Sequence, residues 1–217
     1  MNGADARAAR YAWLWVFGAA AGYLEAAVVV YLRELFYPHG FRFPLQPIPA
    51  RLALVETVRE AVSLVLLAAA ARLAGRRGRD RFGAFMLLFG AWDLVYYAVL
   101  KLVLGWPRTL ADWDVLFLIP LPWVGPVWAP CLVSLALVAA GSYDFWTGAR
   151  PRIRHGADWA MAAAGGLLVI GSFLAEGDAV LEQRLPERFP AWLLAAGMLM
   201  GTAAWLRAET RPAAPRP

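Results

Sequence analysis

Apolar residues are grouped along the chain into six long stretches that are separated by shorter polar segments. A helix needs about 20 apolar residues to cross the hydrocarbon core of a bilayer, and the stretches are close to that length. They are Tyr11–Leu32, Leu52–Ala74, Phe82–Leu104, Val124–Ser142, Trp159–Ala175 and Ala191–Leu206. The pattern predicts an all-α, polytopic helical membrane protein with about six transmembrane helices.

The segment between the third and fourth stretches is long, apolar and rich in proline. Its sequence is GWPRTLADWDVLFLIPLPWVGPVWAP, with prolines at 120, 122, 126 and 130 that would interrupt a long helix. It is too apolar to lie free in water, so we expect Trp113–Ile119 to form an interfacial or re-entrant segment that caps the bundle. Irregular backbone at membrane depth is tolerated only where protein covers it or where it lines a cavity.

Composition supports the membrane interpretation. The chain is 61% hydrophobic and 17% charged, whereas a soluble domain is nearer one quarter charged. The formal net charge of +5 does not indicate nucleic-acid binding, because the arginines are scattered in short segments between the apolar stretches and form no basic face. We therefore expect membrane lipids, and no nucleic acid, as partners.

The distribution of Lys and Arg predicts the orientation of the chain. The N-terminus, the segments after the second and fourth stretches and the C-terminus carry 13 of these residues, and the opposite side carries seven. Both termini are therefore expected in the cytoplasm of a multi-pass protein of the cell membrane, the bacterial inner membrane. One membrane domain, 11–207, would lie between a cytoplasmic N-terminal tail, 1–10, and a Pro-rich cytoplasmic tail, 208–217, that we expect to be disordered.

Ionisable residues within the stretches gather in the outer half of the first three. Asp93, Tyr97 and Lys101 are spaced four residues apart and share one helix face. Glu25 shares a face with Gly18 and Gly22, whose GxxxG spacing allows a neighbouring helix to approach closely. A charge at mid-membrane costs about 2.5–3.5 kcal/mol, which favours a polar site. The predicted catalytic residues are Glu25, Glu56, Glu60, Asp93 and Lys101, and the predicted ligand-binding residues are Arg59, Tyr97, Asp112 and Asp114.

Several chemistries and functions remain open. Glu56 and Glu60 repel each other across one helical turn, so a proton, a nearby arginine or a divalent cation is expected to neutralise them. Haem is not expected, because the two histidines lie in loops on opposite sides. The residues fit an enzyme or binding site for a lipidic or small ligand. The alternatives are an accessory subunit that docks on another membrane subunit or on a second copy of the chain, an ion-coupled transporter, or a purely structural ion-pair network.

The predicted orientation fixes the side of the membrane on which each loop lies. Reporter domains fused after Arg77 or Arg154 should read as cytoplasmic, and those fused at His39 or Pro107 should read as external, because the Lys and Arg excess lies on the cytoplasmic side. Paired alkaline phosphatase and fluorescent-protein fusions at each position measure this. An external signal at Arg77 would reverse the orientation.

Overall fold

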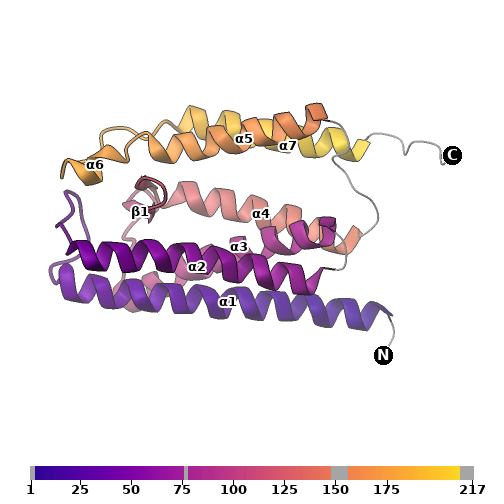
Figure 1. Ribbon diagram of the computed structural model, residues 1–217, viewed down its shortest axis with the longest axis horizontal. Helices are drawn as coiled ribbons and strands as arrows, with labels where there is room; N and C mark the ends of the chain where they lie inside the picture. Colours follow the sequence, from indigo (N-terminus) through magenta and orange to yellow (C-terminus); the bar gives the residue numbers. More distant parts are fainter. Residues whose placement is uncertain (1–2, 76–77, 148–155, 211–217) are drawn as a thin grey trace.

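A computed structural model describes residues 3–75, 78–147 and 156–210, which fold as a bundle of long helices capped at one end (Figure 1). The long helices are α1 (Gly3–Phe36), α2 (Ala50–Ala74), α3 (Gly78–Leu104), α4 (Trp128–Thr147), α5 (Gly156–Leu174) and α7 (Ala191–Thr210). The chain also contains the strands β1 (Trp113–Phe117) and β2 (Trp123–Pro126) and the short helix α6 (Asp178–Leu181). Segments 37–49, 105–127 and 175–190 lie together at what we call the capped end (Figure 1).

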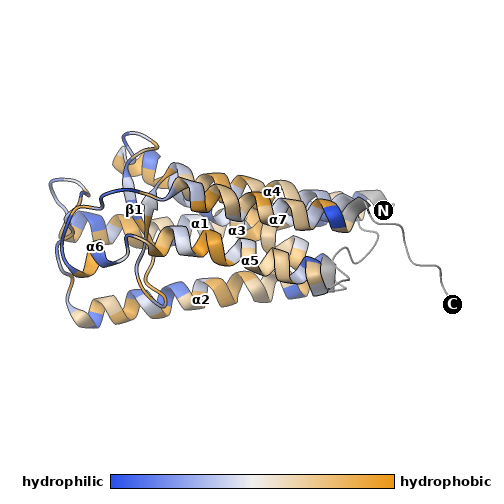
Figure 2. Cartoon of the chain, turned by 90° about the horizontal axis from the view of Figure 1, so that it is seen from above, coloured by the Kyte–Doolittle hydropathy of each residue, from blue (hydrophilic) through white to orange (hydrophobic). Residues whose placement is uncertain are grey.

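Each of the six predicted apolar stretches contains a long helix, so the all-α fold class is confirmed. Five of these helices, all except α2, are long and apolar enough to cross a membrane. Charged residues within α2, including Glu56, Arg59 and Glu60, reduce its apolar character. Large apolar side chains such as Leu73, Leu102 and Leu199 are exposed on the outside of the bundle, and polar residues concentrate near its two ends (Figure 2).

The helix ends depart slightly from the predicted stretches. α1 begins at Gly3 and α7 ends at Thr210, so helix extends into the segments 1–10 and 208–217 that were assigned as tails. The fourth helix begins at Trp128, and Val124 belongs instead to β2. Arg77 and Arg154, which are the proposed cytoplasmic fusion points, lie outside the described residues.

The proline-rich segment before α4 forms a β-hairpin over the capped end of the bundle. β1 pairs antiparallel with β2, and Asp114 lies opposite Gly125 while Val115 lies opposite Val124. This strand pairing is the secondary structure of the expected interfacial or re-entrant piece, Trp113–Ile119. The prolines prevent a helix here, and the hairpin satisfies the backbone by pairing the two strands with each other.

Glycines allow the helices to approach one another closely. A Cβ added at Gly22 of α1 would lie 2.4 Å from the Trp92 backbone oxygen of α3, and one added at Gly18 would lie 2.9 Å from Ala91. The predicted close approach of a helix to the Gly18–Gly22 face is therefore confirmed. Between α5 and α7, a Cβ at Gly197 would lie 2.6 Å from the Gly165 oxygen. These glycines serve contacts within the chain.

The helix pair α5–α7 joins the rest of the fold mainly at the capped end. Phe173 of α5 and Leu194 of α7 are buried in one cluster with Ala129 at the start of α4. The Trp123 ring of β2 stacks on Phe173 with the two planes only 14° apart. The hairpin therefore connects the α5–α7 pair to the body made of α1, α2, α3 and α4.

The Gly22 contact predicts a specific loss of stability. Gly22→Ala should lower the melting temperature in detergent, because overpacking against backbone costs about 1–3 kcal/mol. Gly166→Ala is the matched control, since a Cβ there meets nothing within 4 Å. Its melting temperature should stay the same or rise slightly. Equal melting of both variants would contradict the close α1–α3 contact.

Candidate functional site

The first group of ionisable side chains connects α1 with α2. Arg59 of α2 forms an ion pair with Glu25 of α1 and a second one, at 2.7 Å, with Glu56 one turn earlier. The Ser63 hydroxyl donates a 2.8 Å hydrogen bond to the other oxygen of Glu25. Glu25 is 8% exposed, so the face that it shares with Gly18 and Gly22 lies toward the bundle, and of the cations considered for it, Arg59, Lys101 or a bound ion, the structure places Arg59 beside it.

Glu60 connects α2 with the hairpin. Its carboxylate accepts a 2.7 Å hydrogen bond from the backbone N–H of Leu118, directly after β1. Glu56 and Glu60 are both buried, yet they have different partners: Arg59 for Glu56 and a backbone amide for Glu60. The expected repulsion between them is therefore relieved by separate interactions.

The second group joins α1, α3 and β1 around Asp114. This residue is 1% exposed, and its carboxylate accepts a 2.9 Å bond from Arg33 of α1 and a 3.1 Å bond from the Tyr97 hydroxyl of α3. Burial raises the pKa of the Asp114 carboxyl above its ordinary value, although Arg33 beside it acts in the opposite direction. A buried carboxylate held by both a cation and a hydroxyl fixes the position of the strand that carries it.

Arg33 is enclosed by aromatic rings. Its guanidinium carbon lies 3.7 Å from the Trp106 ring centroid and 4.0 Å from that of Phe41. These are cation–π distances, and such contacts are stronger where water is excluded. The Nη2 atom binds Asp114, but the buried Nη1 atom has no hydrogen-bond partner among the residues that the structure describes. A buried guanidinium with a free donor has unused capacity for an anion.

The other predicted site residues form their hydrogen bonds with partners outside these two groups. Asp93 accepts a 2.7 Å hydrogen bond from Ser134 of α4. Lys101 is exposed and donates to the Pro107 backbone oxygen at 2.7 Å, so it does not join Asp93 as one wall of a pocket. Asp112 accepts bonds from the Arg108 backbone and the Thr109 hydroxyl within a turn. The nine predicted residues therefore do not form a single constellation.

Arginines accompany the buried acids. Arg33 and Arg59 supply the positive charges next to Asp114, Glu25 and Glu56. Within the described residues, no group of three or more His, Cys, Asp or Glu side chains could hold a metal ion. The structure therefore places arginines, together with hydrogen-bond donors, next to the buried acids. The described residues contain no cluster of ligands for the divalent cation that was also considered.

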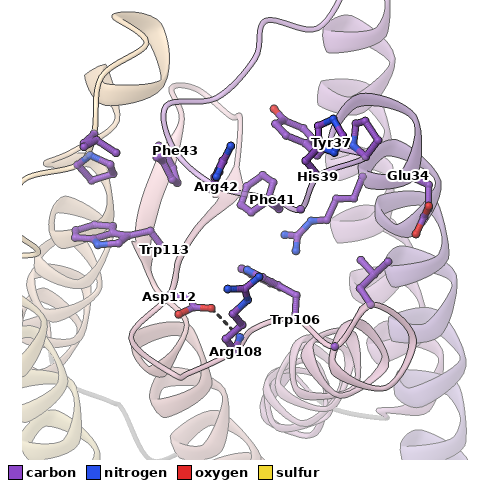
Figure 3. A pocket seen from close by; sticks show the side chains of 17 residues that line it. Glu34, Tyr37, His39, Phe41, Arg42, Phe43, Trp106, Arg108, Asp112 and Trp113 are labelled. Atoms are coloured by element: carbon purple, nitrogen blue, oxygen red, sulfur yellow. Dashed lines mark hydrogen bonds between the residues drawn. The ribbon is translucent and has the colours of Figure 1, made fainter.

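A pocket opens at the capped end beside Arg33. It has a volume of about 660 Å³ and lies between the α1–α2 loop, the start of the hairpin segment and residues 185–186. Figure 3 shows Arg42 and Arg108 toward its middle, whereas Glu34 lies at its edge on α1. Phe41, Phe43, Trp106 and Trp113 supply aromatic walls (Figure 3). The pocket thus combines arginines with apolar surface, which is the usual composition of a ligand site.

Sequence reasoning missed most of this pocket. The sequence predicts only that a nearby arginine neutralises the acids, and Arg33 does this for Asp114. Arg42, Trp106 and Phe41 come from two segments distant in the chain, and no spacing rule relates them. Two further buried acids near the other end of the bundle, Asp144 and Asp158, were also missed, because they lie beyond or at the start of the predicted stretches.

Comparison with known proteins gives no matching family model, no matching curated protein and no matching solved structure. The chemistry open to the site follows from its geometry. The buried carboxylates accept hydrogen bonds from protein donors, while Arg42 and Arg108 form no salt bridge among the described residues. Free guanidinium donors beside aromatic faces suit an anionic, partly apolar ligand.

The Asp114 contacts predict a large effect of a nearly isosteric change. Asp114→Asn should destabilise the protein by about 3–5 kcal/mol, because Arg33 would remain buried without its counter-ion. Thermal melts in one detergent measure this. Adding Arg33→Met should recover part of the loss, and Asp178→Asn is the control, since its ion pair with Arg184 is exposed. A wild-type melt for Asp114→Asn would refute a structural role for the pair.

Proposed function

We propose that this protein is a multi-pass membrane protein that binds a small or lipidic ligand in the pocket at its capped end. The observation that carries the proposal is the buried Arg33, which forms part of the wall of a pocket of about 660 Å³ and whose Nη1 atom has no partner within the described part of the chain. Unsatisfied buried donors are rare in native proteins and require an explanation. A ligand anion supplies one.

Several observations support the membrane setting. Five helices are long and apolar enough to cross a bilayer, and large apolar side chains cover the outer surfaces of the helices. α1 begins and α7 ends at the same end of the bundle, opposite the capped end (Figure 1). With the Lys and Arg excess on the side of the termini, the capped end faces the outside, and the pocket receives its ligand from there or from the outer leaflet.

In this proposal the buried carboxylates are a scaffold for the site. Glu60 and Asp114 hold the hairpin through Leu118 and Arg33, and Glu25 and Glu56 share Arg59. Each therefore has a structural partner that a catalytic proton transfer would have to displace. Asp93 is the exception among the predicted catalytic acids, since it pairs only with the neutral Ser134 hydroxyl among the described residues.

The accessory-subunit alternative loses one of its supports. Glycines at 165, 166, 197 and 201 offer small-residue faces on α5 and α7 on which such a subunit could dock. Gly165 and Gly197 are used in the contact between α5 and α7 within the chain. An ion-coupled carrier would need a continuous polar path to the other end of the bundle, whereas the described charges fall into separate groups: Arg59 with Glu25 and Glu56, Asp93 with Ser134, and Arg33 with Asp114.

Blocking the pocket tests the binding function. Leu185 lines the pocket and is 62% exposed, while Leu181 is 66% exposed and lies outside it. The wild type, Leu185→Trp and Leu181→Trp are purified from host membranes in mild detergent, and co-purifying small molecules are measured by mass spectrometry. The amount of bound molecule that Leu185→Trp retains should fall by about tenfold or more. A steric penalty of about 1.4 kcal/mol in the free energy of binding gives that factor.

The Leu181→Trp control separates blocking of the pocket from a general effect of an added tryptophan. Leu181→Trp should retain the wild-type amount, because its added ring lies on α6 away from the pocket. If all three proteins carry the same molecule in equal amounts, or if the wild type carries none, the proposed binding function is wrong.

A further inference from the structure

The charges around the pocket indicate the chemical class of the ligand. Three arginines take part in its wall: Arg33 from α1, Arg42 from the α1–α2 loop and Arg108 from the segment after α3. Building on the proposed binding function, we propose that the ligand carries a phosphate group that these arginines bind, joined to an apolar portion that the aromatic walls contact.

Arg33 is already paired with Asp114, so the positive potential at the centre of the pocket comes from Arg42 and Arg108, and the acids of the wall do not cancel it there. Asp112 is engaged on both oxygens, with the Arg108 backbone N–H at 2.7 Å and the Thr109 hydroxyl at 2.8 Å. Glu34 lies at the edge of the pocket (Figure 3). Arg42 and Arg108 are exposed and form no ion pair within the described part of the chain, so their donors face the pocket and solvent.

The remaining polar wall groups are compatible with an anion. The Tyr37 hydroxyl donates to the Gln46 backbone oxygen at 3.1 Å, and burial raises the pKa of Tyr37, so it stays neutral. His39 lies in the same wall. No side chain of the wall therefore adds a negative charge besides Asp112 and Glu34.

The three arginines favour phosphate over carboxylate. Arg33 lines the pocket from α1, Arg42 from the α1–α2 loop and Arg108 from the segment after α3, and Figure 3 shows Arg42 and Arg108 toward the middle of the pocket. A tetrahedral phosphate presents oxygens in three directions, and each can accept a charge-assisted bond from a guanidinium fork. Nη1 of Arg33 is enclosed by protein, so a ligand oxygen reaches it only after part of the pocket wall shifts, and Arg42 and Arg108 offer the accessible donors.

The aromatic walls indicate that the phosphate belongs to an amphipathic molecule. Phe41, Phe43, Trp106 and Trp113 come from the same loops as the arginines, and such rings favour the level of lipid headgroups. A phospholipid of the outer leaflet and a soluble phosphate ester share this chemistry. The two sources differ in whether acyl chains contribute to binding.

Four probes separate the contributions. Phosphatidic acid, diacylglycerol, glycerol 1-phosphate and inorganic phosphate are each added to the purified full-length chain in detergent, and binding is measured by native mass spectrometry and calorimetry. Phosphatidic acid against diacylglycerol isolates the phosphate. Phosphatidic acid against glycerol 1-phosphate isolates the acyl chains.

Arginine variants locate the binding in the pocket. Arg42→Gln combined with Arg108→Gln should weaken phosphatidic acid binding by about tenfold or more, because each charge-assisted bond contributes at least that order. Arg188→Gln is the matched control. Arg188 is an exposed arginine at the same end that does not line the pocket, and its loss should leave binding unchanged.

The outcomes are distinct. Tighter binding of phosphatidic acid than of diacylglycerol, lost in the double variant and kept in Arg188→Gln, supports the proposal with a lipid source. Equal binding of glycerol 1-phosphate supports it with a soluble source. Equal binding of diacylglycerol and phosphatidic acid, an equal loss in Arg188→Gln, or no binding of any phosphate probe overturns it. If Leu185→Trp excludes a co-purifying molecule that the arginine variants retain, the pocket binds a ligand but the phosphate inference is wrong.

Discussion

The fold at the capped end depends on one buried ion pair, between Arg33 of α1 and Asp114 of β1. Removing two charges from water is expensive, and the attraction between them offsets the penalty only when further groups satisfy both partners. Tyr97 supplies a hydroxyl to Asp114, and the rings of Trp106 and Phe41 enclose the guanidinium. The pair and its Tyr97 contact thereby join the first helix to the third helix and the hairpin, which follow it in the sequence only after the whole of α2.

The second buried network follows the same principle within the helices. Arg59 lies between Glu25 and Glu56, and Ser63 contributes a further donor to Glu25. In the proposed membrane setting these charges are tolerated because they face the bundle and one another, where lipid cannot reach them. The network also explains why α2 is less apolar than the other long helices. That helix is the least apolar of the long helices because part of its length serves polar contacts with α1 and the hairpin.

The scaffold and the pocket share a residue, and this links stability to binding. Arg33 uses Nη2 to hold Asp114, while its Nη1 atom is unpaired. A ligand anion that reached Nη1 would add to an interaction that already positions the hairpin. The hairpin in turn carries Trp123, which stacks on Phe173 and holds the α5–α7 pair at this end. Occupancy of the pocket would therefore stabilise the contacts that join the two parts of the bundle.

Local patterns in the sequence predict the helices, the contact face of α1 and the side of that helix on which Glu25 lies. Apolar stretches of bilayer length and the spacing of Gly18 and Gly22 are local properties, so they can be read along the chain. The partners of the remaining ionisable residues were decided only by the tertiary structure. Helical periodicity placed Asp93 and Lys101 on one helix face. It could not show that Asp93 accepts a hydrogen bond from Ser134 or that Lys101 donates one to the Pro107 carbonyl. Two further features depend on how the loops fold over the bundle. One is the strand pairing in a segment with four prolines, and the other is the pocket, whose arginines come from three separate segments. Those positions follow from long-range packing and charge pairing, which no local spacing rule encodes.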